Sequence, residues 1–190
     1  MKKILFVDAS VREESRTREL AVHLVRKLRG EVETVRLIDE ELPVLDERLL
    51  AWRNDACEKG DYDSKYFRYA NQFKEADYIV VAAPYWDLSF PAALKNYVEN
   101  ITINGLTFKY DEEGHPVGLC KGSKLYYVTT SGGSFLFPEF SSGYLKAMAC
   151  GMFGVADFAC IAAENLDVIG TDVDKVMAEA KAVIDEQIPY

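Results

Sequence analysis

Hydroxyl and guanidinium side chains gather directly after the first apolar run of the sequence, residues 4–7. Together with the free amides of a helix N-terminus, such groups bind a phosphate monoester. The helix dipole favours an anion there by roughly 0.3–1 kcal/mol at an exposed site. The segment therefore predicts a phosphate site, although Ser15 or Thr17 would equally serve as an ordinary helix cap. The candidate residues are Ser10, Arg12, Ser15, Arg16 and Thr17.

A second candidate segment carries aromatic side chains at the end of another apolar run. Tyr85 and Trp86 are suited to flank a planar ring while the backbone beside them bonds to the edge of that ring. Either ring would equally pack beneath the helix that follows. The segment consists of Pro84, Tyr85, Trp86, Asp87 and Leu88.

A third segment lies at the end of the strand-like run 124–130. It consists of Thr130, Ser131, Gly132 and Gly133. Its glycines allow a backbone to approach a ligand closely, and its hydroxyls can donate to carbonyl or ring-nitrogen atoms. An ordinary glycine turn has the same composition. The sequence contains neither G-x-G-x-x-G nor G-x-x-x-x-G-K-[ST], so a mononucleotide fits these segments better than a dinucleotide.

The elements that must position these segments alternate along the chain. Short continuous apolar runs such as 78–84 are typical of strands covered on both faces, and helix patterns separate them. This order predicts an α/β fold with right-handed crossovers and a doubly wound, five-stranded parallel sheet. Ligands of such sheets bind beyond the carboxyl ends of the strands, where the three segments lie. The predicted strands are 4–7, 31–38, 78–84, 124–130 and 153–162, and the predicted helices are 17–29, one opening at Ser64, 91–101, 142–149 and 172–187.

Three further stretches complete the predicted organisation. Residues 106–119 read as a β-hairpin inserted between the parallel units. Residues 39–63 are acidic and broken by proline and glycine, which indicates a long loop with room for a helical turn. The aromatic residues between 43 and 69 suit a dimer contact, a lid or a satellite core cluster. Gly30 is expected to stop the first helix, and His23 to face solvent from it.

Length and charge exclude several classes of protein. At 190 residues, positions 1–190 suit one domain. The net charge of −9 repels nucleic acid and anionic membrane surfaces. No cysteine or histidine spacing suggests a metal, and the N-terminal apolar run is too short for a signal sequence, so we expect a cytoplasmic protein with reduced thiols. The residues concerned are Cys57, Cys120, Cys150, Cys160, His23 and His115.

Taken together, these segments resemble the FMN-dependent NADH azoreductases and quinone reductases, a family of flavodoxin-like fold. The resemblance consists of a strand, S-x-x-x-x-S-x-T and a helix, followed by PYWDLSFPAALKNYVENI, the hairpin TFKYDEEGHPVGL and TTSGG. AAENL near residue 164 is similar to the family's C-terminal pattern. The resemblance spans most of the chain.

The resemblance implies a sheet order of 2-1-3-4-5 and an FMN site. Ser10, Ser15, Arg16 and Thr17 would bind the FMN phosphate, residues 85–88 would line the isoalloxazine ring, and 130–133 would contact its pyrimidine edge. It also implies a homodimer that carries electrons from NADH or NADPH to a quinone or azo compound in a ping-pong cycle. The flavin performs the hydride chemistry, so no catalytic side chain is predicted.

The chain also departs from the family pattern. Asp87 and Leu88 stand where many relatives have Asn and Phe, Ser131 where Arg is common, and Phe135 where some have His. A carboxylate beside the ring disfavours an anionic reduced flavin unless it is hydrogen-bonded or protonated. These departures therefore leave the identity of the preferred electron acceptor undecided. A flavodoxin-like electron carrier and a flavin-free module for a phosphorylated ligand are the two alternatives.

Overall fold

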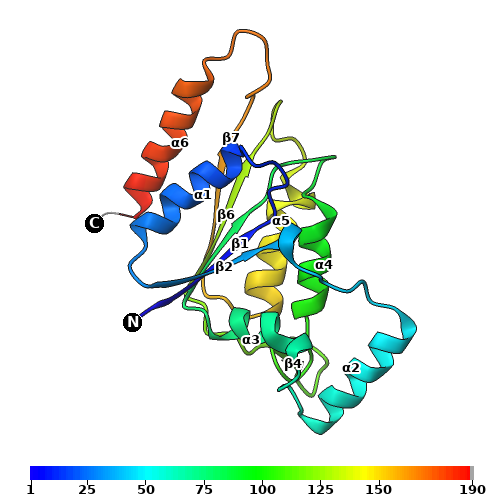
Figure 1. Cartoon of the computed structure of the whole chain (residues 1–190). Coiled ribbons are helices and arrows are strands. Elements are labelled where there is room, and N and C mark those ends of the chain that lie inside the picture. The colour runs from blue at the N-terminus through cyan, green and yellow to red at the C-terminus, as the bar shows by residue number, and fades with distance from the viewer. Residues whose placement is uncertain (189–190) are drawn as a thin grey trace.

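A computed structural model of the chain describes residues 1–188, and a parallel sheet of five strands forms its centre (Figure 1). The strand order is β2-β1-β3-β6-β7, and every neighbouring pair is parallel. Because β6 and β7 are the fourth and fifth strands of this sheet along the chain, the predicted order 2-1-3-4-5 is confirmed. The strands are β1 (Lys3–Asp8), β2 (Glu31–Arg36), β3 (Tyr78–Ala82), β6 (Lys124–Thr130) and β7 (Phe158–Ala163).

Helices cover both faces of the sheet, as Figure 1 shows. Side chains alternate between the two faces along β1: Leu5 and Val7 join one core cluster and Phe6 joins the other. This double coverage explains the nearly continuous apolar runs of the central strands. α1 (Arg16–Lys27) and α6 (Val173–Gln187) pack on the Phe6 side, while α3 (Arg68–Glu75), α4 (Ala92–Ile101) and α5 (Ser142–Lys146) pack on the other.

The first helix ends differently from the prediction. α1 ends at Lys27 with Leu28 as its C-cap, so Gly30 does not stop the helix. A Cβ at Gly30 would lie 2.3 Å from the carbonyl oxygen of Lys2. Glycine is therefore needed here because the segments around Lys2 and Gly30 approach each other closely at the start of β2, where the amide of Glu31 donates to Lys2 O at 2.8 Å.

The prediction of a loop over residues 39–63 is wrong. A helix, α2 (Glu47–Lys59), occupies most of this stretch, capped by Asp46 at its start and by Gly60, with φ of 65°, at its end. Only Ala56 of α2 is buried, so the sequence carries no strong amphipathic signal there. In Figure 1 the helix projects from the side of the molecule that carries α4. Short 3₁₀ turns, Leu37–Asp39 and Lys65–Phe67, precede and follow it.

The second half of the chain follows the predicted order with shifted boundaries. The antiparallel hairpin β4 (Phe108–Tyr110) and β5 (Pro116–Gly118) is confirmed. A 3₁₀ turn, Pro138–Phe140, precedes α5, and a π-helix, Ala147–Met152, extends it. The predicted start of the last strand is wrong, because residues 153–157 form a loop before β7. Pro91 and Asp172 lie one position outside their helices, as N-caps. Within residues 1–188, no helix is long and apolar enough to span a membrane.

Candidate functional site

The three segments singled out in the sequence meet at the carboxyl edge of the sheet. Together they line one cavity of about 1240 Å³. Three predicted residues lie outside its lining: Ser10 is buried, Leu88 is exposed in the adjoining turn, and Gly133 follows the last lining residue of its loop. The predicted residues that line it are Arg12, Ser15, Arg16, Thr17, Pro84, Tyr85, Trp86, Asp87, Thr130, Ser131 and Gly132.

One end of the cavity is formed by the N-terminus of α1. The Oγ atom of Ser15 caps the helix by accepting from the amide of Arg18 at 3.2 Å. The amides of Arg16 and Thr17 find no acceptor within residues 1–188. Thr17 is buried, and its Oγ1 lies 2.6 Å from Oγ1 of Thr130, which ties the first segment to the third. Capping and anion binding can therefore share this helix end.

The cavity lining is balanced in charge, with five Arg and Lys residues and five Asp and Glu residues, whereas the whole chain has a net charge of −9. The guanidinium of Arg16 lies 3.3 Å from Oδ1 of Asp167, and both side chains are largely exposed. Exposed ion pairs of this kind contribute little, about 0–1 kcal/mol, so Arg16 can exchange Asp167 for another anion at small cost. Arg12 is exposed on the same rim, and Lys181 of α6 also lines the cavity, where it pairs with Glu19 at 2.6 Å.

Aromatic rings form the wall that follows β3. Tyr85 packs edge-to-face on Phe135 with ring centroids 4.6 Å apart, and its amide donates to the carbonyl oxygen of Thr130 at 2.9 Å. The Tyr85 hydroxyl is buried and has no hydrogen-bond partner among the described residues. Trp86 is 39% exposed and lies at the rim. Next to this wall, burial raises the pKa of the Tyr127 hydroxyl on β6, so the hydroxyl stays neutral. It donates to Ala83 O at 3.4 Å.

The turn after Trp86 is strained. Trp86 and Ser89 exchange two backbone hydrogen bonds, of 3.1 and 2.8 Å, around Asp87 and Leu88. Both central residues are left-handed, with φ of 50° and 65°. This tight turn favours Asn or Asp followed by Gly, so Asp87 suits it, whereas Leu88 costs roughly 1–3 kcal/mol. Backbone strain of this kind concentrates at functional sites.

The glycine loop after β6 is held by the chain itself. Its carbonyls at Ser131, Gly132 and Gly133 accept amides of residues 165–167, at 3.0–3.1 Å. A Cβ at Gly132 would lie 2.5 Å from Oδ2 of Asp167, so this glycine makes room for Asp167. At Gly133 a Cβ would meet nothing within 4 Å. The sequence predicted that a ligand approaches the backbone closely at these glycines. At Gly132 this space is instead filled by Asp167, in the loop that follows β7.

Several residues of this site carry no signal in the sequence. Asp167 and Lys181 reach the cavity only because the β7–α6 region folds back beside α1, and no local pattern predicts that. His23 was expected to face solvent, but it is half-buried and its Nε2 lies 2.7 Å from Oδ1 of Asp185 on α6. The lining residues that are not among the predicted site residues are Val11, Glu13, Glu14, Arg18, Glu19, Val22, His23, Arg26, Leu166, Asp167 and Lys181.

Comparison with known proteins agrees with this architecture. The sequence model of a family described as having a flavodoxin-like fold matches residues 2–188. The chain belongs to this family. The chain is 38% identical over 189 residues to the FMN-dependent NADH:quinone oxidoreductase 2 of Clostridium acetobutylicum, covering 93% of each chain. It is 36% identical over 195 residues to the FMN-dependent NADH:quinone oxidoreductase of Caldicellulosiruptor saccharolyticus, covering 95% of this chain and 94% of the relative.

Solved structures of azoreductases superimpose over nearly the whole chain. The azoreductase of Bacillus anthracis strain Sterne has a TM-score of 0.84 at 25% identity, with 99% of both chains covered. An FMN-dependent NADH-azoreductase of Bacillus anthracis strain Ames Ancestor, solved with FMN, shares the fold with a TM-score of 0.80 at 24% identity, covering 99% of this chain and 100% of that one. The resemblance to azoreductases and quinone reductases seen in the sequence is thus confirmed.

Proposed function

We propose that this chain binds FMN and transfers electrons from NADH or NADPH to a quinone or azo acceptor. The observation that carries the proposal is the convergence of three segments on one cavity: an anion-binding helix end, an aromatic wall and a glycine loop. The curated relatives, named FMN-dependent NADH:quinone oxidoreductases, and the structurally similar azoreductases support the same activity. FMN supplies the hydride chemistry when it is bound, and the protein binds and orients it.

The residues present fit FMN. The unpaired amides at the start of α1 suit its phosphate, and the unpartnered, buried Tyr85 hydroxyl suits a polar ligand in the cavity. We assign the phosphate to Arg12, Ser15, Arg16 and Thr17, the isoalloxazine ring to residues 84–87, and its pyrimidine edge to residues 130–132. Ser10, Leu88 and Gly133 lie outside the lining, and we propose that they support these contacts from the adjoining positions of the same three segments. About 1240 Å³ exceeds the volume of a typical ligand pocket, so a second planar molecule can also enter.

The cavity has room for a planar molecule beside FMN, and we propose a ping-pong order in which donor and acceptor occupy that space in turn. Tyr85 and Trp86 form the wall that both must pass, and we propose that they select the acceptor by its shape. No side chain of the site is proposed as a general acid or base. A cytoplasmic location is part of the proposal, in keeping with four cysteines that are free thiols.

The visible spectrum of the purified protein tests this proposal. We expect a flavin absorption band, its loss when NADH is added without oxygen, and its return when menadione is added. Steady-state NADH oxidation with menadione, without a partner reductase, separates an enzyme from a flavodoxin-like carrier. A colourless protein that takes up no added FMN would contradict the proposal and favour a flavin-free module.

We further propose that the chain forms a homodimer through the rim of this cavity. Leu136, Phe137 and Phe140 are at least half exposed, and Ser89, which closes the Trp86 turn, donates to Phe140 O at 2.7 Å and so joins this segment to the rim. Such a gathering of exposed apolar side chains beside a ligand cavity is typical of an interface. The second candidate surface is α2, with Leu50 exposed.

Light scattering after size-exclusion chromatography tests the dimer and its surface. The wild-type chain is expected to elute with twice the mass of 21.4 kDa. Replacing Phe137 and Phe140 together with aspartate is expected to yield a monomer, because two charges would be buried in an apolar interface. Leu50→Asp is the control and should leave the dimer intact. If only Leu50→Asp dissociates it, the interface lies on α2.

A further inference from the structure

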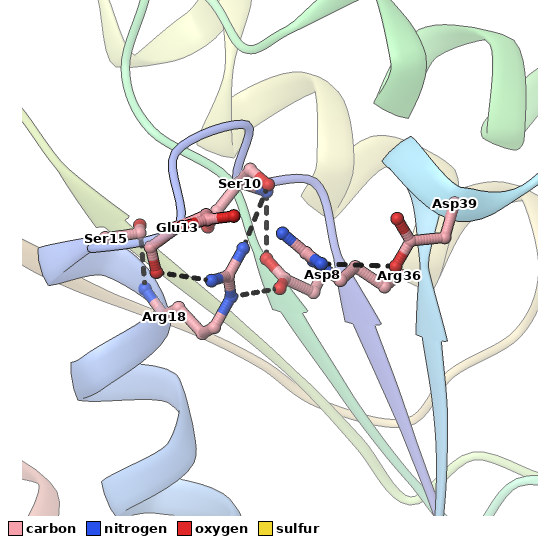
Figure 2. A network of polar contacts seen from close by, with 7 residues as sticks. All are labelled: Asp8, Ser10, Glu13, Ser15, Arg18, Arg36 and Asp39. Carbon is pink, nitrogen blue, oxygen red and sulfur yellow. Dashed lines mark hydrogen bonds and ion pairs between the residues drawn. The ribbon is translucent and has the colours of Figure 1, made fainter.

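A buried carboxylate and an arginine join the two ends of the loop that precedes α1 (Figure 2). Asp8, at the end of β1, is 2% exposed. Its Oδ1 accepts the amide of Ser10 at 2.8 Å, and its Oδ2 accepts Nε of Arg18 at 2.5 Å. The guanidinium of Arg18 also donates to the carbonyl oxygens of Glu13, at 2.8 Å, and Ser10, at 3.2 Å. One side chain of α1 therefore fixes the end of β1 and two peptide groups of the loop.

These two peptide groups have a defined direction. Residues 1–188 contain no cis peptide, and in a trans peptide the carbonyl and the following N–H point in opposite directions. Since the carbonyls of Ser10 and Glu13 point at Arg18, the amides of Val11 and Glu14 must point away from it. Both residues line the cavity, and neither amide has an acceptor in the described chain.

We propose that the Asp8–Arg18 pair is a positioning element for phosphate recognition, which turns the amides of Val11 and Glu14 toward the anion. This inference rests on the proposed FMN site and adds two backbone donors to it. Arg18 is assigned a positioning role because three of its five N–H groups, one on each guanidinium nitrogen, already donate to Asp8 and to the loop. Its positive charge is matched by the carboxylate of Asp8.

The variant Arg18→Lys tests the proposal with the charge pair retained. A lysine ammonium can still pair with Asp8, but it lacks the planar fork that also holds two carbonyls. We expect the dissociation constant of FMN to rise at least 10-fold, and that of riboflavin, which lacks the phosphate, to change less than about 2-fold. Quenching of flavin fluorescence measures both constants. An equal loss for both flavins would show a general packing effect and overturn the proposal.

Amide NMR shifts on addition of inorganic phosphate give a second readout that needs no flavin. In the wild-type chain the resonances of Val11 and Glu14 are expected to move, and in Arg18→Lys they are expected to stay. Unmoved resonances in the wild-type chain would refute the role of these amides. If the wild-type chain bound neither flavin while these shifts occurred, the proposed function would fail and the positioning role would stand.

Two further variants complete the design. Arg36→Gln is the matched control, since the side chain of Arg36 pairs with Asp39 at 3.2 Å and no hydrogen bond or ion pair joins it to the loop within residues 1–188 (Figure 2). It should leave both flavin affinities unchanged. Arg18→Gln alone leaves a buried carboxylate without its cation and is expected to destabilise the fold. Asp8→Asn combined with Arg18→Gln removes both charges, and its expected FMN loss matches that of Arg18→Lys.

Discussion

Replacing Ser15 with alanine and Thr17 with valine is expected to weaken FMN binding about 100-fold. The two hydroxyls lie at the N-terminus of α1, where the amides of Arg16 and Thr17 are unpaired within residues 1–188. A hydrogen bond to a charged phosphate contributes roughly 1.5–3 kcal/mol, and each 1.4 kcal/mol is tenfold in affinity. Loss of two such bonds therefore accounts for two orders of magnitude. Titration with FMN, followed by flavin fluorescence, measures the change.

Valine is chosen at position 17 because the residue is buried and an alanine would leave a cavity. The double variant still loses the Thr17–Thr130 contact of 2.6 Å and the Ser15 cap, at a cost of about 2 kcal/mol. Asp46→Ala is the control for this cost, since it removes the cap of α2 far from the cavity. It should lower stability without changing FMN affinity. Unchanged FMN affinity in the double variant would contradict the phosphate assignment.

The central sheet was predictable because burial on both faces leaves a direct trace in the sequence. Residues 78–82 are nearly all apolar, and the strand they form lies in the middle of the sheet. The position of the site was predictable for a related reason. Parallel strands bring their carboxyl ends to one edge, so the loops after β1, β3 and β6 had to be neighbours.

Other features have causes that no local pattern carries. α2 was missed because only Ala56 is buried, although Asp46 and Gly60 mark its ends as cap residues. Asp167 reaches the glycine loop through pairing of residues 165–167 with residues 131–133, a contact between segments more than thirty residues apart. Arg18 looked like an ordinary helix residue, because its partners depend on how residues 8–13 turn in space.

Replacing Gly118 with alanine is expected to destabilise the fold by about 3 kcal/mol. A Cβ at this position would lie 2.1 Å from the backbone nitrogen of Gly154 and 2.1 Å from the carbonyl carbon of Phe153. Both are backbone atoms, so no side chain can rotate away, and the hairpin must move off the chain beneath it. Gly118 belongs to the TFKYDEEGHPVGL hairpin and does not line the cavity. Its lack of a side chain lets the hairpin backbone pack directly on the backbone of residues 153–154.

Thermal or urea unfolding measures this effect, with a fall in Tm of roughly 6–12 °C for a chain of this length. Gly151→Ala is the matched control: Gly151 lies in the π-helix just before residues 153–154, and a Cβ there meets nothing within 4 Å. It should leave Tm unchanged or raise it slightly, since alanine restricts the unfolded chain. Because the Cys120 amide also donates to Phe153 O at 3.1 Å, displacing the hairpin breaks that bond too. Equal Tm values for the two variants would contradict the prediction, because they would show that the backbone around Gly118 accommodates an added methyl group.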